Sequence, residues 1–353
     1  ALRSRVFVRD LHAFIKTHGL QGKIPNQHVI VFDEAQRAWD AAFMEYKRRV
    51  ARSEPELLIE AGVRVPDWSL LVGLVGEGQE IFSGEEAGIR QWRGAVAASD
   101  AKWTIYCPPR LASEFEGLEV HMHDELDLTV SLRSHRAEEL HTWVALLLQG
   151  SVALAARQAM RIQGAETYPM YVTRDFDEAK EYVRARYDGE EDKRYGVLVS
   201  SHAKNLQRMG IKSGYLDQRK MKVARWFNAP PDDVLSGCSF DMPVTEFQCQ
   251  GLEVDMPIVG WGSDYRWDGA SWNLRPIRRQ YAQEDPVQLL QNAYRVLLTR
   301  GRDGLVVWVP QGEEMNLTEH VLLAAGLRPL PEADDVTVGA PPIVGGSSVL
   351  GAG

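Results

Sequence analysis

The sequence has few cysteines and no long apolar run. Its three cysteines, Cys107, Cys238 and Cys249, form no C-x-x-C pair, which argues against structural zinc and against a disulfide framework. No apolar stretch reaches the roughly 18 residues of a membrane-spanning helix. The first residues, Ala1–Arg5, lack the apolar segment of a secretory signal. We therefore expect a cytoplasmic protein that does not enter a membrane.

Positive charge is also scarce. The chain has 40 Lys and Arg against 49 Asp and Glu, for a net charge of -9. A protein whose whole surface attracts nucleic acid is usually basic, and this balance argues against such a surface. A local basic groove stays open, because binding depends on the charge of the groove rather than on the sum.

What the chain does have is an alternation of short apolar runs and amphipathic stretches. The predicted strands are 28–32, 68–75, 103–107, 118–121, 126–132, 195–200, 256–261 and 305–309, and the predicted helices are 5–17, 35–51, 87–98, 137–161, 177–187 and 286–299. This alternation predicts the α/β class, with parallel sheets flanked by helices. We expect one domain over 1–125, a second over 126–330 and a flexible Pro- and Gly-rich tail over 331–353.

Two adjacent carboxylates follow the first of these apolar runs. A buried strand that ends in Asp33 and Glu34 is typical of the Walker B arrangement, because α/β sheets bind ligands at the carboxyl edge of their strands. In that arrangement Asp33 holds Mg²⁺ through water and Glu34 orients and deprotonates the attacking water. The alternative is the first turn of a helix, where the helix dipole favours acidic residues.

Four further segments contain groups that could contact a nucleotide. The amide of Gln79, after a Gly-rich turn, could hydrogen-bond a γ-phosphate or the attacking water. Arg133 and Arg300 lie at element ends, where a guanidinium could stabilise charge on a transferring phosphoryl group. Gly251 permits close approach to a ligand, and Glu253 could accept hydrogen bonds from a ribose. The alternative for each is an ordinary turn residue or a solvated side chain.

Two other patterns have competing interpretations. His121 and His123 alternate on a predicted strand, but no third ligand for a metal is evident. The aromatic and arginine residues within 261–279 could clamp single-stranded nucleic acid, or the segment could be a loop that packs through its Trp rings. We favour packing for this segment and no metal for the histidines.

Taken in order, the segments resemble the motifs of superfamily 1 helicases. They are DEAQ (33–36) for motif II, GEGQ (76–79) for motif III, LRSH (132–135) for motif IV, TEFQCQGLE (245–253) for motif V and NAYRVLLTRG (292–301) for motif VI. The closest resemblance is to a bacterial domain related to the Schlafen DNA/RNA helicase group, in which NAYRVLLTRG is characteristic. It covers residues 5–310 approximately.

The resemblance implies two RecA-like lobes, with ATP and Mg²⁺ in the cleft between them and a DNA or RNA strand as the partner. It assigns metal binding to Asp33, the catalytic base to Glu34, γ-phosphate sensing to Gln79, the arginine fingers to Arg133 and Arg300, the ribose contact to Glu253 and close backbone approach to Gly251.

One essential motif is missing from the sequence. No G-x-x-x-x-G-K-[ST] loop occurs, and the strings at 19–24 and 210–213 have the wrong spacing. Without that loop the chain lacks the amide cradle and the lysine for the β and γ phosphates. We expect the loop to lie upstream, the first lobe to be incomplete and this chain alone to be inactive. A nucleotide-gated switch or scaffold that unwinds nothing, and a non-catalytic helicase-like fragment, remain alternatives.

Overall fold

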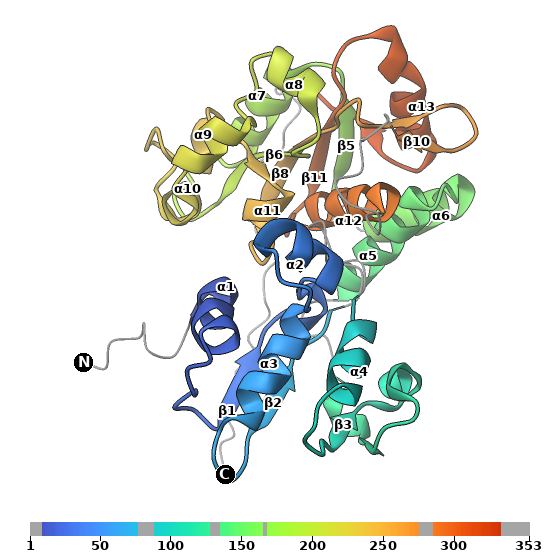
Figure 1. Cartoon of the computed structure of the whole chain (residues 1–353). Coiled ribbons are helices and arrows are strands. Elements are labelled where there is room, and N and C mark those ends of the chain that lie inside the picture. The colour runs from blue at the N-terminus through green and yellow to red at the C-terminus, as the bar shows by residue number, and fades with distance from the viewer. Residues whose placement is uncertain (1–8, 77–87, 128–134, 165–167, 275–284, 333–353) are drawn as a thin grey trace, which may run out of the picture. The chain divides into compact units, whose positions relative to one another are not determined.

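The computed structural model describes residues 9–76, 88–127, 135–164, 168–274 and 285–332. The chain forms two compact units: unit 1 comprises Ala1–Leu148 with Leu274–Thr299, and unit 2 comprises Gln149–Asn273 with Arg300–Gly353 (Figure 1). No helix in the described ranges is long and apolar enough to cross a membrane. The expected domain boundaries at 125/126 and 330/331 stay predictions.

Unit 2 is built on a six-stranded parallel sheet in the order β12, β5, β11, β8, β6, β7. Its strands are β5 (Met170–Thr173), β6 (Tyr195–Val199), β7 (Val244–Thr245), β8 (Met256–Gly260), β11 (Leu305–Trp308) and β12 (Arg328–Pro329). The central strands β6, β8 and β11 are buried along their whole length, as expected for a parallel sheet covered on both faces. The predicted α/β class, with a parallel sheet flanked by helices, is confirmed.

Helices of two kinds surround this sheet. The longer ones are α6 (Val152–Gln163), α7 (Phe176–Arg186) and α13 (Asn316–Ala324), and the short ones are α8 (Lys204–Arg208), α9 (Tyr215–Lys220), α10 (Val223–Asn228) and α11 (Glu246–Cys249). α7 packs on β5, β8 and β11 and contributes Ala179, Tyr182 and Val183 to the main core. A small two-stranded sheet of β9 (Tyr265–Trp267) and β10 (Trp272–Leu274) lies against α13 through β9.

Unit 1 contains two small parallel sheets in its described part. One pairs β1 (Val29–Phe32) with β2 (Leu70–Gly73), so that Phe32 lies opposite Gly73. The other pairs β3 (Ile105–Cys107) with β4 (Val120–Met122). The carboxyl ends of β1 and β2 therefore lie side by side, and the DEAQ and GEGQ segments begin there.

The helices of unit 1 are α1 (Leu11–Phe14), which continues as η2 (Ile15–Leu20), α2 (Ala41–Arg48), α3 (Glu54–Val63), α4 (Arg90–Ala97), α5 (His135–Leu148) and α12 (Pro286–Leu298). α3 starts at a capping box between Ser53 and Glu56, which satisfies two backbone amides at the helix start. Its residues Leu57 and Leu58 form a small core with Ile15 and Met44.

β1 is less buried than the sequence predicts. Val29 and Val31 are 46% and 61% exposed, whereas the side chain of Phe32 packs against the core of α3 and its neighbours. The prediction of a buried strand was wrong, because β1 pairs only with β2 among the described residues and only one of its faces is covered. Val29 and Val31 lie on the uncovered face.

The helix predicted over 137–161 is two helices. α5 ends at Leu148 and α6 begins at Val152, and Gly150 between them has a φ of +79°. A residue in this left-handed region cannot continue an α-helix, and glycine is the residue that adopts it without strain. Several other elements were not predicted from the sequence: the helices α3, α8, α9, α10, α11 and α13 and the strands β5, β7, β9, β10 and β12.

Candidate functional site

The two carboxylates predicted to bind metal and water lie in a sharp turn at the carboxyl end of β1. Glu34 has a φ of +55° and a ψ of +49°, a left-handed conformation that is uncommon for a residue with a side chain and is often found at functional sites. Its backbone amide donates to Oδ1 of Asp33 at 3.1 Å. The helical segment that follows is only Ala35–Arg37, and Glu34 makes no side-chain cap bond to it. A helix-capping role therefore does not explain this pair.

Gln36 fixes the carboxylate of Glu34, a role that was not predicted from the sequence. Gln36 is 1% exposed. Its Nε2 donates to Oε2 of Glu34 at 2.6 Å, and its Oε1 accepts a bond from the backbone amide of Gly76 at 3.0 Å. The side chain thus connects the acidic turn to the Gly-rich turn after β2. In the sequence, the only sign of this role of Gln36 was its place in the DEAQ segment.

The backbone reinforces this connection between the two turns. The amide of Ala35 donates to the carbonyl of Leu74 at 2.7 Å, and Nε1 of Trp92, on α4, donates to the carbonyl of Ala35 at 2.9 Å. A Cβ on Gly73 would lie 3.1 Å from the Cβ of Ala35. Glycine at this position lets the turns approach closely, so the acidic turn is held by β1, β2 and α4 together.

Asp33 is suited to a shared metal site rather than a closed one. Its side chain is exposed at the strand end, and carboxylate oxygen is the donor that Mg²⁺ prefers. In the described ranges no three His, Cys, Asp or Glu side chains gather into a group that could hold a metal. This includes His121 and His123 near β4, of which His121 stacks on Tyr106 with ring centroids 5.3 Å apart. A single carboxylate is enough where phosphate and water supply the other ligands.

In unit 2 the segments that precede β8 and β11 are joined to each other. The amide of Val254 donates to the carbonyl of Arg300 at 2.9 Å, and the amide of Arg302 donates to the carbonyl of Val254 at 2.9 Å. Nη1 of Arg300 donates to the carbonyl of Leu252 at 3.2 Å. The structure therefore joins the end of the TEFQCQGLE segment to Arg300, near the end of the NAYRVLLTRG segment.

The three predicted site residues of these segments differ in their surroundings. Arg300 is 6% exposed and belongs to the buried polar structure of the unit. Glu253 accepts a bond at 3.3 Å from Nε of Arg302, a residue with a half-exposed side chain that was not singled out from the sequence. Gly251 has a φ of +77°, and no atom lies within 4 Å of the position its Cβ would occupy, so its turn requires glycine for backbone conformation. Their roles toward a nucleotide stay predictions.

Two predicted residues, Gln79 and Arg133, lie outside the described residues, and their roles also stay predictions. The segment within 261–279 is described up to Leu274. There Trp261 and Tyr265 are 0% and 1% exposed, and Trp272 stacks on both rings, with centroids 5.1 and 4.9 Å away. The packing interpretation is confirmed for these rings.

Two buried carboxylates lie at the carboxyl edge of the sheet in unit 2. Glu246, after β7, accepts bonds from the amide and the hydroxyl of Ser201, after β6, at 2.9 and 2.6 Å. Asp264, after β8, accepts a bond from the hydroxyl of Ser200 at 2.7 Å. Burial raises the pKa of Glu246 above its usual value, against the opposing effect of the Ser201 hydrogen bonds. These bonds join the ends of three strands.

All three cysteines are buried and unpaired. Burial raises the pKa of the Cys249 thiol to about 12, so this thiol stays protonated near neutral pH. Because the thiolate is the reactive form, Cys249 is not suited to nucleophilic chemistry, although it lies within the TEFQCQGLE segment.

A profile of a known protein family matches most of the chain. The profile of the family described as Schlafen group 3, DNA/RNA helicase domain matches residues 2–311, a range that includes the two turns after β1 and β2 and the TEFQCQGLE and NAYRVLLTRG segments. No curated protein matches the chain. Because the profile covers most of the sequence and the ordered motifs lie within it, the chain belongs to the Schlafen group 3 DNA/RNA helicase domain family.

Proposed function

We propose that this helicase-type domain carries out Mg²⁺-dependent ATP hydrolysis coupled to a DNA or RNA strand. The observation that carries the proposal is the acidic turn after β1, in which Gln36 holds the Glu34 carboxylate at 2.6 Å and the Gly76 amide at 3.0 Å. Such a link makes the position of Glu34 depend on the turn that leads to Gln79. In this proposal Gln79 responds to the γ-phosphate and so controls the geometry of Glu34.

The other roles follow from the chemistry of each side chain. Asp33 would hold Mg²⁺, which supplies charge neutralisation at the phosphates. Glu34 would accept the proton of the attacking water, and Arg133 and Arg300 would stabilise the charge that develops on the phosphoryl oxygens. Glu253 would accept hydrogen bonds from the ribose, next to the close backbone approach at Gly251.

The mechanism also needs a phosphate-binding loop, and the 353 residues contain no sequence that matches one. The string at 19–24 is the end of η2 and the residues after it, so a helix precedes it, whereas a phosphate-binding loop follows a strand and precedes a helix. The open face of β1, with Val29 and Val31 exposed, supports a further apolar element on that side. We propose that an upstream segment with the loop covers it.

ATP hydrolysis by the full reading frame, with and without single-stranded DNA and RNA, tests the proposal. We expect turnover that rises with at least one polymer. Glu34→Gln should preserve ATP binding and lower turnover by about 10²–10⁴-fold, because the general base is lost. Equal turnover in the variant and the parent would remove Glu34 from the mechanism. Turnover that no strand changes would favour a nucleotide-gated switch, and absence of turnover would favour a non-catalytic helicase-like protein.

A further inference from the structure

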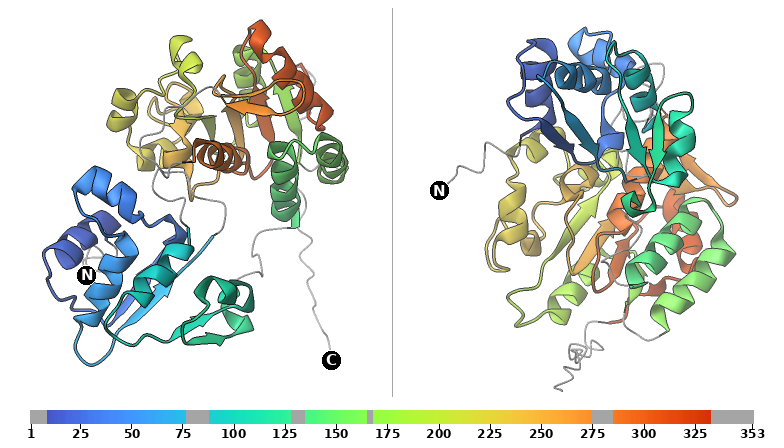
Figure 2. Two further views of the ribbon diagram at one scale, coloured as in Figure 1. Left: turned by 45° about the vertical axis from the view of Figure 1, so that its right-hand side comes forward. Right: turned by 90° about the horizontal axis from the view of Figure 1, so that it is seen from below.

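A basic segment of unit 2 connects β6 to β7. From Lys204 to Arg225 the sequence has seven Lys or Arg residues and a single acidic one, Asp217. The segment therefore carries a charge of +6, and because the whole chain carries -9, the rest of it carries -15. It comprises α8, α9 and the start of α10 (yellow-green to yellow in Figures 1 and 2).

All seven cationic side chains of this segment are exposed, and together we call them the basic surface. They are Lys204, Arg208, Lys212, Arg219, Lys220, Lys222 and Arg225. Lys212 pairs with Asp241 at 2.6 Å and Arg225 with Asp233 at 3.0 Å, and the other five make no ion pair with any residue that the structure describes. Clustered cations without counter-charges repel one another, so their presence in an acidic chain points to a polyanionic ligand.

The surface is anchored to the sheet by buried polar and aromatic contacts. Nε2 of Gln218, on α9, donates to the carbonyl of Pro243 at 3.1 Å. Nε1 of Trp226, on α10, donates to the carbonyl of Met242 at 2.8 Å, and the Trp226 ring is 3% exposed. These contacts fix α9 and α10 beside β7, so the cations project from a fixed support.

An exposed aromatic ring lies among the cations. Tyr215 and Leu216, at the start of α9, are 75% and 69% exposed, and the guanidinium of Arg219 lies 5.8 Å from the centroid of the Tyr215 ring. A solvent-exposed ring beside phosphate-binding cations is the arrangement on which the bases of a single strand stack. A duplex keeps its base faces covered and cannot use it.

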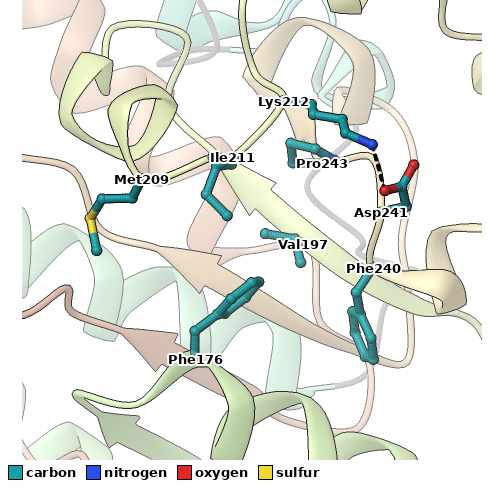
Figure 3. Close-up of a pocket in the computed structure, with 9 residues that line it drawn as sticks. Phe176, Val197, Met209, Ile211, Lys212, Phe240, Asp241 and Pro243 are labelled. Atoms are coloured by element: carbon teal, nitrogen blue, oxygen red, sulfur yellow. Dashed lines mark hydrogen bonds and ion pairs between the residues drawn. The ribbon is translucent and has the colours of Figure 1, made fainter.

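A small cavity with mixed polar and apolar walls lies beside Lys212 of the basic surface. It has a volume of about 230 Å³, and its walls include the rings of Phe176 and Phe240 and the side chains of Met209 and Ile211, while the Lys212–Asp241 ion pair lies at its rim (Figure 3). Phe240 has a φ of +60°, a strained conformation for an aromatic residue. A recess with aromatic walls beside a row of cations suits a base that has left the stack.

We propose that the basic surface binds a single strand of nucleic acid, with phosphates along the cations and a base stacked on Tyr215. The inference rests on the proposed strand-coupled function and locates the strand on unit 2. Charge complementarity selects a polyanion, and the exposed Tyr215 ring, with the Phe-lined recess nearby, favours a single strand over a duplex.

Binding of fluorescent oligo-dT and oligo-U to the parent chain and to a K220E/K222E variant tests the proposal. We expect the variant to bind at least tenfold more weakly to both polymers, and its log K against log[salt] slope to fall by about 1.4, because each lost phosphate contact on a single strand contributes about 0.7. The matched control is R157E/R161E, which makes the same charge change on exposed positions of α6 in the same unit. Its binding should stay within about threefold of the parent, because the charges there are not part of the surface.

The aromatic part of the surface has its own test. Tyr215→Ala should weaken single-strand binding by about tenfold and leave duplex binding unchanged, because only unpaired bases stack on the ring. The thermal midpoints of all variants should match that of the parent, since every substituted residue is exposed.

Two results would contradict the inference, and they are distinguishable from each other. If the parent binds strands and K220E/K222E loses no more affinity than R157E/R161E, the strand lies elsewhere, while the proposed ATPase stands. If the parent binds neither polymer although the full reading frame hydrolyses ATP, the strand-coupled function fails and this inference fails with it.

Discussion

β1 in unit 1 and β11 in unit 2 are both short runs of apolar residues, yet they differ sharply in burial. In β11, Val306 and Val307 are fully buried, because β5 and β8 flank the strand and α7 packs on it. In β1, Val29 and Val31 are 46% and 61% exposed. The comparison teaches that an apolar run predicts a strand, whereas its burial depends on the elements that cover it.

The difference has a functional side. The described sheet of unit 2 buries its central strands with its own helices, but the acidic turn of unit 1 stands on a two-stranded sheet with one open face. The predicted catalytic carboxylates, Asp33 and Glu34, therefore follow a strand that fewer neighbouring strands and helices cover than the central strands of unit 2. Local bonds, above all those of Gln36, have to provide the order that the sheet does not.

The sharpest test of the comparison places the same charge in each strand. Val307→Asp should lower the free energy of unfolding of unit 2 by about 4 kcal/mol or more, because the carboxylate is buried without a partner. Val31→Asp should change stability by less than about 0.5 kcal/mol, because the side chain is mostly in water. Urea denaturation followed by tryptophan fluorescence measures both, and equal losses would mean that Val31 is covered in solution.

A second test concerns the buried carboxylate that unit 2 tolerates. Burial raises the folded-state pKa of Glu246 from its ordinary 4.5, so in the folded state the carboxyl keeps its proton at pH values where the unfolded chain has lost it. The contribution of this carboxyl to stability therefore falls as the pH rises above 4.5, by up to about 1.4 kcal/mol per pH unit, until the folded-state pKa is reached.

Glu246→Gln removes this titration, so the stability of the variant relative to the parent should increase with pH over the same window and then level off. Denaturation at pH values from 4.5 upward measures it. The exposed Glu191 provides the control, because Glu191→Gln should give a difference that does not vary with pH. A flat difference for Glu246→Gln would show that the carboxyl is ionised in the folded state at ordinary pH.

The smallest expected effect is local to unit 1. Gln36→Ala removes the acceptor of the Gly76 amide, and the loss of a bond worth about 1 kcal/mol should speed hydrogen exchange at Gly76 by roughly fivefold. Exchange at Val254, in the joined segments of unit 2, should stay unchanged. Faster exchange throughout the chain would show that Gln36 supports the whole fold rather than the acidic turn.

Much of the fold was predictable from local pattern. The continuous apolar runs of β6, β8 and β11 predict strands, because buried parallel strands need apolar side chains on both faces. β5 was missed, since its MYVT sequence is short and mixed. The break between α5 and α6 depends on the backbone of Gly150, which a helical pattern on both sides concealed.

The candidate site divides in the same way. The acidic pair and the segments around Glu253 and Arg300 were found because each motif is contiguous in sequence. Gln36 was assigned no role because its partner, the amide of Gly76, lies 40 residues away. The basic surface was missed because its cations are spaced irregularly over α8, α9, α10 and the turns between them, and the sequence does not show that all seven side chains are exposed.

The buried thiols have a practical consequence for anyone who wants to watch this domain at work. All three cysteines are buried, and the Cys249 thiol is protonated near neutral pH. Maleimide dyes should therefore not label the folded chain in the absence of denaturant. A cysteine introduced at an exposed position outside the proposed sites, such as Met160 on α6, would then be the single labelling point. Site-specific fluorescence becomes possible without a cysteine-free background.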